Sequence, residues 1–185
     1  MLTGNPSGLV ERAYVFAKAA HEAVGQVRKY SGEPYIVHPV EVAGLVRSVT
    51  HTDEMVAAAL LHDTVEDTKI TAPDIKSEFG AEVAALVGWL TDVSRKEDGN
   101  RAVRKAIDRE HTASAPAAAK TIKLADLISN SQSILAHDPD FARVYLREKA
   151  ALLEVLKEGD AALWKRAHQL LEEGLRALSP TAVSA

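Results

Sequence analysis

Hydrophobic residues recur at helical spacing along most of the chain. Residues 8–24 follow a Pro-Ser entry and carry one apolar stripe, made of Val10, Ala13, Tyr14, Ala17, Ala20 and Val24. This period of about 3.6 residues predicts a first amphipathic helix. Residues 117–137 have apolar side chains around most of the helical circumference, which predicts a largely buried helix. No alternating strand pattern runs longer than four residues. The pattern therefore predicts an all-α fold.

Capping residues and helix breakers divide this pattern into about eight helices. Asp53 is expected to cap a helix that runs on through MVAAALLHDTVED, and Gly80 separates two shorter helices. Asp138 and Pro139 supply an N-cap and a first-turn proline for a later helix. Between the first two helices, GQVRKYSGEPYIVHP has the glycines and prolines of a structured loop. The last residues, 179–185, are expected to be frayed.

Length and composition limit the possible functions. The 185 residues fit one domain over 1–185, with a core over about 10–175. The net charge of −4 gives no basic field for nucleic acid or an anionic membrane, so neither is expected as a partner. No secretory or transmembrane pattern is found, so we expect a cytoplasmic protein. Because there is no cysteine, a metal would be bound by His, Asp or Glu.

The first polar cluster interrupts a hydrophobic helix. His62 and Asp63 follow seven apolar residues, and Glu66 and Asp67 come four residues after each of them. On one helix, these four side chains would share a broad face. Three carboxylates and an imidazole repel and desolvate one another unless a cation joins them. A core histidine paired with a carboxylate is the alternative for the His-Asp dipeptide alone.

Two further motifs favour the metal. Residues 35–39, YIVHP, bring His38 out of the loop, and IKLADLISN places Asp126 inside an apolar helix with Asn130 four residues later. Two imidazoles and two carboxylates would neutralise a divalent cation and leave coordination positions for water and phosphate. Glu66 and Asp67, one turn beyond the ligands, are candidates for acid/base catalysis. The residues thus point to metal-dependent hydrolysis of a phosphorylated compound.

These motifs resemble those of a known family. The phrases RKYSGEPYIVHP, AALLHDTVEDT, FGAEV and IKLADLISN occur in the order found in the HD-domain alarmone hydrolases of the Rel/Spo superfamily, most closely the small stand-alone members. The resemblance implies a compact helical HD domain that uses manganese. It also implies removal of the 3′-pyrophosphate of (p)ppGpp, an alarmone of the stringent response, with GDP or GTP and pyrophosphate as products. The expected partner is thus a small-molecule nucleotide.

The resemblance assigns roles residue by residue. It implies metal ligands at His38, His62, Asp63 and Asp126, a catalytic pair at Glu66 and Asp67, and nucleotide contacts at Arg28, Lys29, Asn130 and Tyr145. A solvated loop is the alternative for the Arg-Lys pair. The other histidines have no partner motif and are expected to be surface or packing residues: His21, His51, His111, His137 and His168.

Some positions depart from the family pattern. Leu127 and Gln132 stand where long Rel proteins carry basic residues, and Tyr30 is an additional residue in the loop. Because these positions lie near the nucleotide in the family, adenosine alarmones stay open beside guanosine ones. Two other functions also stay open: another HD-type nucleotide phosphohydrolase, and a nucleotide-binding regulatory module without turnover. The oligomeric state is open as well, with a homodimer as one candidate.

Overall fold

The structure is a computed structural model that describes residues 8–178, and within them it is all-α. Nine α-helices and one 3-10 helix follow one another in this part of the chain. Their bounds are α1 Leu9–Ala23, α2 Val37–Arg47, α3 Asp53–Leu61, α4 Thr64–Asp67, α5 Ala72–Leu90, η1 Lys96–Asp98, α6 Arg101–Ala113, α7 Ala117–His137, α8 Pro139–Val155 and α9 Ala161–Ala177. The predicted fold class is confirmed. The frayed tail expected at 179–185 lies outside the described residues, and the extent of the single domain stays a prediction.

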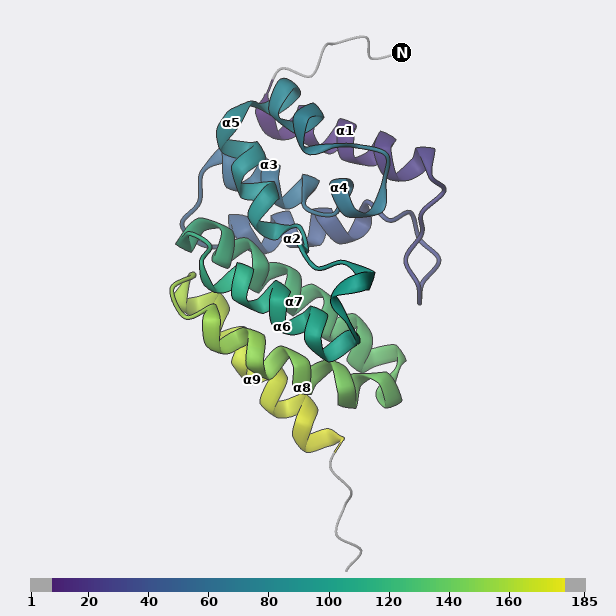
Figure 1. Cartoon of the computed structure of the whole chain (residues 1–185), viewed down its shortest axis with the longest axis vertical. Coiled ribbons are helices and arrows are strands. Elements are labelled where there is room, and N and C mark those ends of the chain that lie inside the picture. The colour runs from purple at the N-terminus through teal and green to yellow at the C-terminus, as the bar shows by residue number, and fades with distance from the viewer. Residues whose placement is uncertain (1–7, 179–185) are drawn as a thin grey trace, which may run out of the picture.

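The helices form two packed groups that meet at α7. In Figure 1, α1 to α5 lie at one end of the molecule and α6 to α9 at the other. Helix α3 packs against α1, α2 and α5, and α7 packs against α2, α3 and α5 on one side and α8 and α9 on the other. Side chains from α2, α3 and α7 can therefore meet between the two groups.

The sequence explains why α7 is the central helix. Pro116 occupies its N-cap position, and its observed bounds are those expected from the apolar pattern. Ile122, Leu124 and Ile128 are fully buried on it. It ends at Asp138, whose carboxylate accepts a hydrogen bond from the Phe141 backbone N–H at 3.2 Å and so caps α8 as predicted.

The expected continuous helix through His62 and Asp63 is wrong. Helix α3 ends at Leu61, and α4 begins at Thr64. The His62 Nδ1–H donates to the Ala59 carbonyl at 2.8 Å, and the Thr64 hydroxyl donates to the Leu61 carbonyl at 2.7 Å. These side chains compete for carbonyls that the backbone N–H groups of the next turn would use, which favours a break.

Two smaller expectations are also wrong. Thr52, not Asp53, caps α3, because its hydroxyl accepts a hydrogen bond from the Met55 N–H. In α1 the predicted stripe is rotated, since Tyr14 and Val24 are exposed while His21 is buried. Helix α1 packs against α3. Small buried side chains at this contact let the two helices approach closely.

The loop between α1 and α2 is structured, as predicted. An isolated antiparallel bridge joins Val27 to Pro34. The Arg28 N–H donates to the Glu33 carbonyl at 2.8 Å, and Gly32 has a φ of 72°, a conformation that glycine adopts without strain. Gly80, with a φ of 88°, similarly breaks α5 into the two predicted segments.

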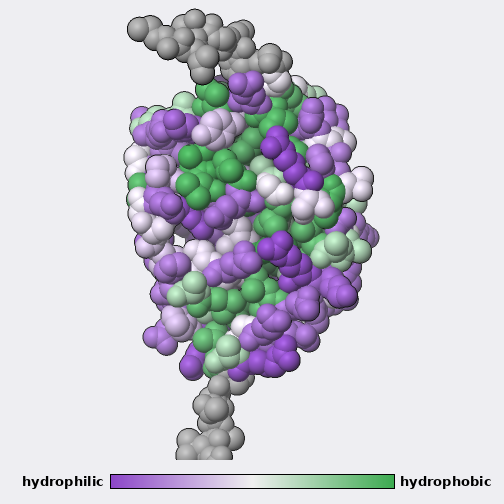
Figure 2. All heavy atoms as spheres, turned by 180° about the vertical axis from the view of Figure 1, so that it is seen from behind, coloured by the Kyte–Doolittle hydropathy of each residue, from purple (hydrophilic) through white to green (hydrophobic). Residues whose placement is uncertain are grey.

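The rear face in Figure 2 shows patches of hydrophobic residues with hydrophilic residues between them. Exposed large apolar residues such as Val15 and Val144 are common on protein surfaces and carry no argument by themselves. Among residues 8–178, no helix has both the length and the apolar character needed to cross a membrane.

Candidate metal centre

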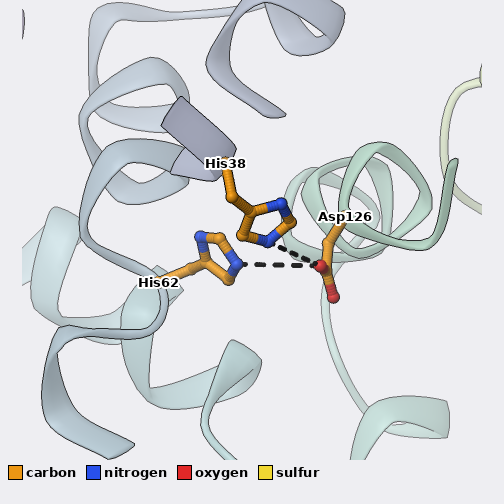
Figure 3. A group of neighbouring side chains, drawn as sticks. All are labelled: His38, His62 and Asp126. Atoms are coloured by element: carbon orange, nitrogen blue, oxygen red, sulfur yellow. Dashed lines mark ion pairs between the residues drawn. The ribbon is translucent and has the colours of Figure 1, made fainter. Parts of the chain in front are cut away.

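Four side chains from three parts of the chain converge between the two helix groups. The Nε2 atom of His38 on α2 lies 3.3 Å from Asp126 Oδ1 on α7 and 3.6 Å from Asp63 Oδ2. The Nε2 atom of His62 lies 3.1 Å from Asp63 Oδ2 and 3.7 Å from Asp126 Oδ1. Figure 3 shows both imidazoles directed at the Asp126 carboxylate. All four residues expected as metal ligands thus lie together.

The distances suit a divalent cation. Metal–ligand bonds of about 2.1 Å separate adjacent ligand atoms by about 3.0 to 3.4 Å in octahedral or tetrahedral geometry. The ligand atoms of His38, His62 and Asp126 lie within 4.8 Å of one another. Asp63 lies outside that group of three, but its Oδ2 approaches both imidazoles within 3.6 Å. We therefore treat Asp63 as a candidate fourth donor beside the group of three.

Hydrogen bonds fix the tautomers of both histidines. The Ser129 hydroxyl donates to Glu41 Oε2 at 2.8 Å, so at 3.0 Å from His38 Nδ1 it accepts the imidazole proton. The Nδ1 atom of His62 lies 2.8 Å from the Ala59 carbonyl, which can only accept. Each neutral imidazole therefore carries its proton on Nδ1, and its Nε2 lone pair faces the point of convergence.

Burial of the two imidazoles costs free energy that binding of a cation would offset. His38 and His62 are each 1% exposed, and His62 Nε2 has no hydrogen-bond partner within the described part of the chain. A buried polar atom without a partner costs free energy. Two nitrogen and two carboxylate oxygen donors are a set that divalent metals bind. The residues present therefore fit a metal ion.

The pKa shifts show that positive charge is favoured at this point. Burial lowers the pKa of His62, but the carboxylates of Asp63 and Asp126 outweigh it and hold that pKa well above the usual value. Burial raises the pKa of Asp63, and the His62 imidazole more than compensates, leaving it below the usual range. The pKa of Asp126 is also low because the imidazoles and Lys123 outweigh burial. A divalent cation would use the same field.

Neighbouring side chains hold the two carboxylates. The Tyr35 hydroxyl donates to Asp63 Oδ2 at 2.6 Å, and the Asn130 amide donates to Asp126 Oδ1 at 2.6 Å. The Lys123 ammonium lies 3.6 Å from Asp126 Oδ2. Asn130 thus contacts a proposed ligand directly, a role different from the nucleotide contact that the resemblance assigns to it.

Sequence reasoning missed Tyr35, Ser129 and Glu41 as site residues. Ser129 and Glu41 each lie three residues after a proposed ligand on the same helix, and Tyr35 lies three residues before one. Residues three apart on a helix are neighbours, so this spacing was the available signal for the two helical residues. Their hydrogen bonds across α2 and α7 depend on how the helices pack.

The two residues of the proposed catalytic pair, Glu66 and Asp67, lie in different surroundings in the structure. Glu66 Oε1 accepts a hydrogen bond from the Asp92 N–H at 2.6 Å, and desolvation of the carboxylate raises the pKa of Glu66 to about 7. Asp67 Oδ2 instead accepts from the Gln26 amide at 2.8 Å on the exposed surface. The structure therefore supports Glu66 more strongly than Asp67 as a group that exchanges protons near pH 7.

Three cavities border the centre or the side chains hydrogen-bonded to it, and one of about 510 Å³ is lined by Arg28, Glu41 and Ser129. A cavity of about 610 Å³, here called the site cavity, is lined by Asp63, Glu66, Lys123, Arg101, Lys105 and Lys149, among others. A smaller one of about 320 Å³, the loop cavity, is lined by Arg28, Lys29, Tyr35 and Asn130 together with Tyr30 and Phe141. The expected nucleotide contacts Arg28, Lys29 and Asn130 are thus grouped, whereas Tyr145 is buried and lines none of these three cavities.

Comparison with known proteins agrees with the fold and the motifs. The HD domain family matches residues 13–154. A protein of Synechocystis sp. named probable guanosine-3′,5′-bis(diphosphate) 3′-pyrophosphohydrolase is 34% identical over 96% of this chain and 23% of its own length. A Myxococcus xanthus protein named GTP pyrophosphokinase is 44% identical over 47% of this chain and 11% of its own length. The chain thus spans less than a quarter of these curated relatives.

One solved structure matches this chain over nearly the full length of both proteins. It is described as a metazoan ortholog of SpoT that hydrolyzes ppGpp and plays a role in starvation responses. The two folds superpose with a TM-score of 0.80 at 27% identity, over 94% of this chain and 99% of that one. Together with the match over residues 13–154, this shows that the chain belongs to the HD domain family.

Proposed function

We propose that the chain is a metal-dependent hydrolase that removes the 3′-pyrophosphate of (p)ppGpp-like alarmones. The products would be GDP or GTP, or the adenosine analogues, together with pyrophosphate. The observation that carries this proposal is the convergence of two Nε2 lone pairs and two carboxylates beside a cavity rich in basic side chains. The structural relative that hydrolyzes ppGpp has the same fold over nearly its whole length.

The proposed cofactor is a divalent metal held by His38, His62, Asp63 and Asp126, and the family resemblance indicates manganese. Such an ion supplies Lewis-acid activation of water and of a phosphoryl oxygen. The protein's own part is to hold four donors at fixed spacing. Ser129, Tyr35 and Asn130 orient three of these donors through the hydrogen bonds described above.

Glu66 is the proposed proton acceptor. Its carboxylate lies in the wall of the site cavity together with Asp63, and its pKa of about 7 lets it take a proton from water near neutral pH. The reaction joins a water oxygen to the phosphorus that carries the ribose 3′ oxygen and breaks the bond to that oxygen, which ends protonated. Asp67 remains a candidate for this second proton transfer.

The nucleoside is proposed to lie in the loop cavity. Arg28 and Lys29 provide positive charge there, and Tyr30 and Phe141 provide aromatic surface. The Lys29 ammonium is already paired with Asp138 at 3.2 Å, so Arg28 is the more available cation. The proposed substrates include both guanosine and adenosine alarmones. A homodimer and a cytoplasmic location also remain part of the proposal.

The test is to incubate the protein and manganese with ppGpp, pppGpp and ppApp and to separate the products by chromatography. Pyrophosphate and a nucleoside 5′-polyphosphate should appear, and Asp63→Ala should abolish them. Absence of pyrophosphate from all three compounds would contradict the proposal. A panel of nucleoside monophosphates and cyclic nucleotides, run in parallel, would reveal another HD-type phosphohydrolase. Binding of ppGpp without turnover would indicate a regulatory module.

A further inference from the structure

Three cations that line the site cavity make no ion pair within residues 8–178, namely the half-buried Lys149 and Arg109 and the exposed Arg147. Among its basic residues, Arg101 is paired with Glu148 at 2.7 Å, and Lys105 with Asp92 at 2.8 Å. Lys149 makes no hydrogen bond or ion pair within residues 8–178, and its ammonium lies 5.1 Å from the centre of the Tyr145 ring.

The surroundings of Lys149 make its charge costly. Burial and the neighbouring ammonium groups of Lys123 and Lys105 together lower the pKa of Lys149 to about 8, against the opposite influence of Asp126 and Asp92. An ammonium that is partly buried among other cations is stabilised when an anion joins them. The carboxylates of Asp92, Asp108 and Glu148 in the cavity wall pair with Lys105 and Arg101, so Lys149 is left as a place for further negative charge.

The position of the cavity relative to the metal centre suggests which anion binds. Asp63 faces the site cavity, while Tyr35 and Asn130, which hold the two carboxylates, face the loop cavity. The centre therefore lies between the two spaces. A substrate bound across it would place its reacting phosphorus at the centre and its two ends in different cavities. The aromatic loop cavity suits a nucleoside, and the unpaired cation suits a polyanion.

We propose that the site cavity binds the pyrophosphoryl part of the substrate, with its terminal phosphate on Lys149. This inference rests on the proposed function and adds an anion subsite to it. After hydrolysis, the same contacts would hold the pyrophosphate product. Lys149 would then contribute to substrate selection by requiring a second phosphate beyond the one at the metal centre.

The experiment is isothermal titration with inorganic pyrophosphate and, separately, with GDP, with manganese equal in cell and syringe. Lys149→Met keeps the length of the side chain and removes its charge. We expect it to weaken pyrophosphate binding by about tenfold or more and to change GDP binding by less than about twofold. Lys149→Arg should restore most of the pyrophosphate affinity. Lys157→Met is the matched control, since Lys157 is exposed and paired only with Glu154.

Other outcomes separate the two proposals. If Lys149→Met weakens GDP binding and spares pyrophosphate, the cavity holds the 5′-polyphosphate and the inference is wrong. Equal pyrophosphate binding by Lys149→Met and Lys157→Met would also overturn it, provided that thermal melting shows both variants folded. If wild-type protein binds pyrophosphate through Lys149 but releases none from any alarmone, the proposed function fails while the anion subsite stands.

Discussion

Replacement of Ser129 by alanine tests whether the tautomer of His38 controls metal binding. The Ser129 hydroxyl is the only acceptor that the structure gives to His38 Nδ1, at 3.0 Å. Without it, the imidazole can move its proton to Nε2, which lies 3.3 Å from Asp126 Oδ1. The proton would then occupy the direction in which the lone pair should meet the cation.

The size of the effect follows from these contacts. His38 is 1% exposed, so an unpaired Nδ1–H would cost about 1 to 3 kcal/mol. When the metal binds, the Ser129→Ala variant has either to leave Nδ1–H unpaired or to move the proton back from Nε2 to Nδ1. Both correspond to an affinity that is lower by about 10- to 100-fold. The metal-free protein should change little, because the alternative tautomer donates to Asp126.

The assay is titration calorimetry of manganese into metal-free protein. Ser131→Ala is the matched control, because Ser131 lies on the same helix, is 4% exposed like Ser129, and contacts no proposed ligand. Ser129→Ala should bind manganese about 10- to 100-fold more weakly than this control. Affinities within about twofold of each other would refute the tautomer argument.

Three further predictions concern catalysis and stability. The rate should increase as the pH is raised to about 7, because Glu66, with its pKa of about 7, becomes ionised. Glu66→Gln should remove this acidic limb of the pH–rate profile and lower kcat by about 10²- to 10⁴-fold. An unchanged limb would exclude Glu66 as the base. Gly159→Ala should lower the free energy of unfolding by about 1 to 3 kcal/mol, because the new Cβ would lie 2.8 Å from Leu124 Cδ1 and 3.1 Å from the α7 backbone. Gly88→Ala is the control, since its Cβ would meet nothing within 4 Å and should not destabilise the protein. Chemical denaturation of the two variants measures the difference. Manganese at about 100 times its dissociation constant should add about 2.7 kcal/mol of stability, and His62→Ala should lose most of this gain in thermal melts.

The sequence predicted the elements whose signals are local. Helix α7 has its expected bounds because Pro116 and Asp138 end it at both sides, and apolar side chains cover most of its circumference. The break after Leu61 could not be predicted in this way. It depends on hydrogen bonds by His62 and Thr64 to carbonyls within the same turn, and helix propensity alone does not reveal such competition.

For the site, motifs identified residues but not distances. The proposed ligands were found because polar groups interrupt apolar helices, a pattern visible in one dimension. Glu41 and Ser129 escaped notice because both are ordinary polar residues until α2 packs against α7 and brings them to 2.8 Å. The site cavity likewise combines side chains from α6, α7 and α8, whose juxtaposition no local pattern records.

The break between α3 and α4 has a consequence for the affinity of the site. Consecutive side chains on a regular helix point about 100° apart, and His62 and Asp63 both keep right-handed helical backbone angles. At the break, Asp63 has a φ of −95° and a ψ of −5°, and its carboxylate lies 3.1 Å from the neighbouring imidazole. The dipeptide therefore offers two donor atoms that already lie close together, and in the proposed metal site the second bond would form at high effective concentration. The Thr64 hydroxyl donates to the Leu61 carbonyl at this turn, so a side chain outside the proposed ligand set helps to hold the backbone that carries two of the proposed ligands.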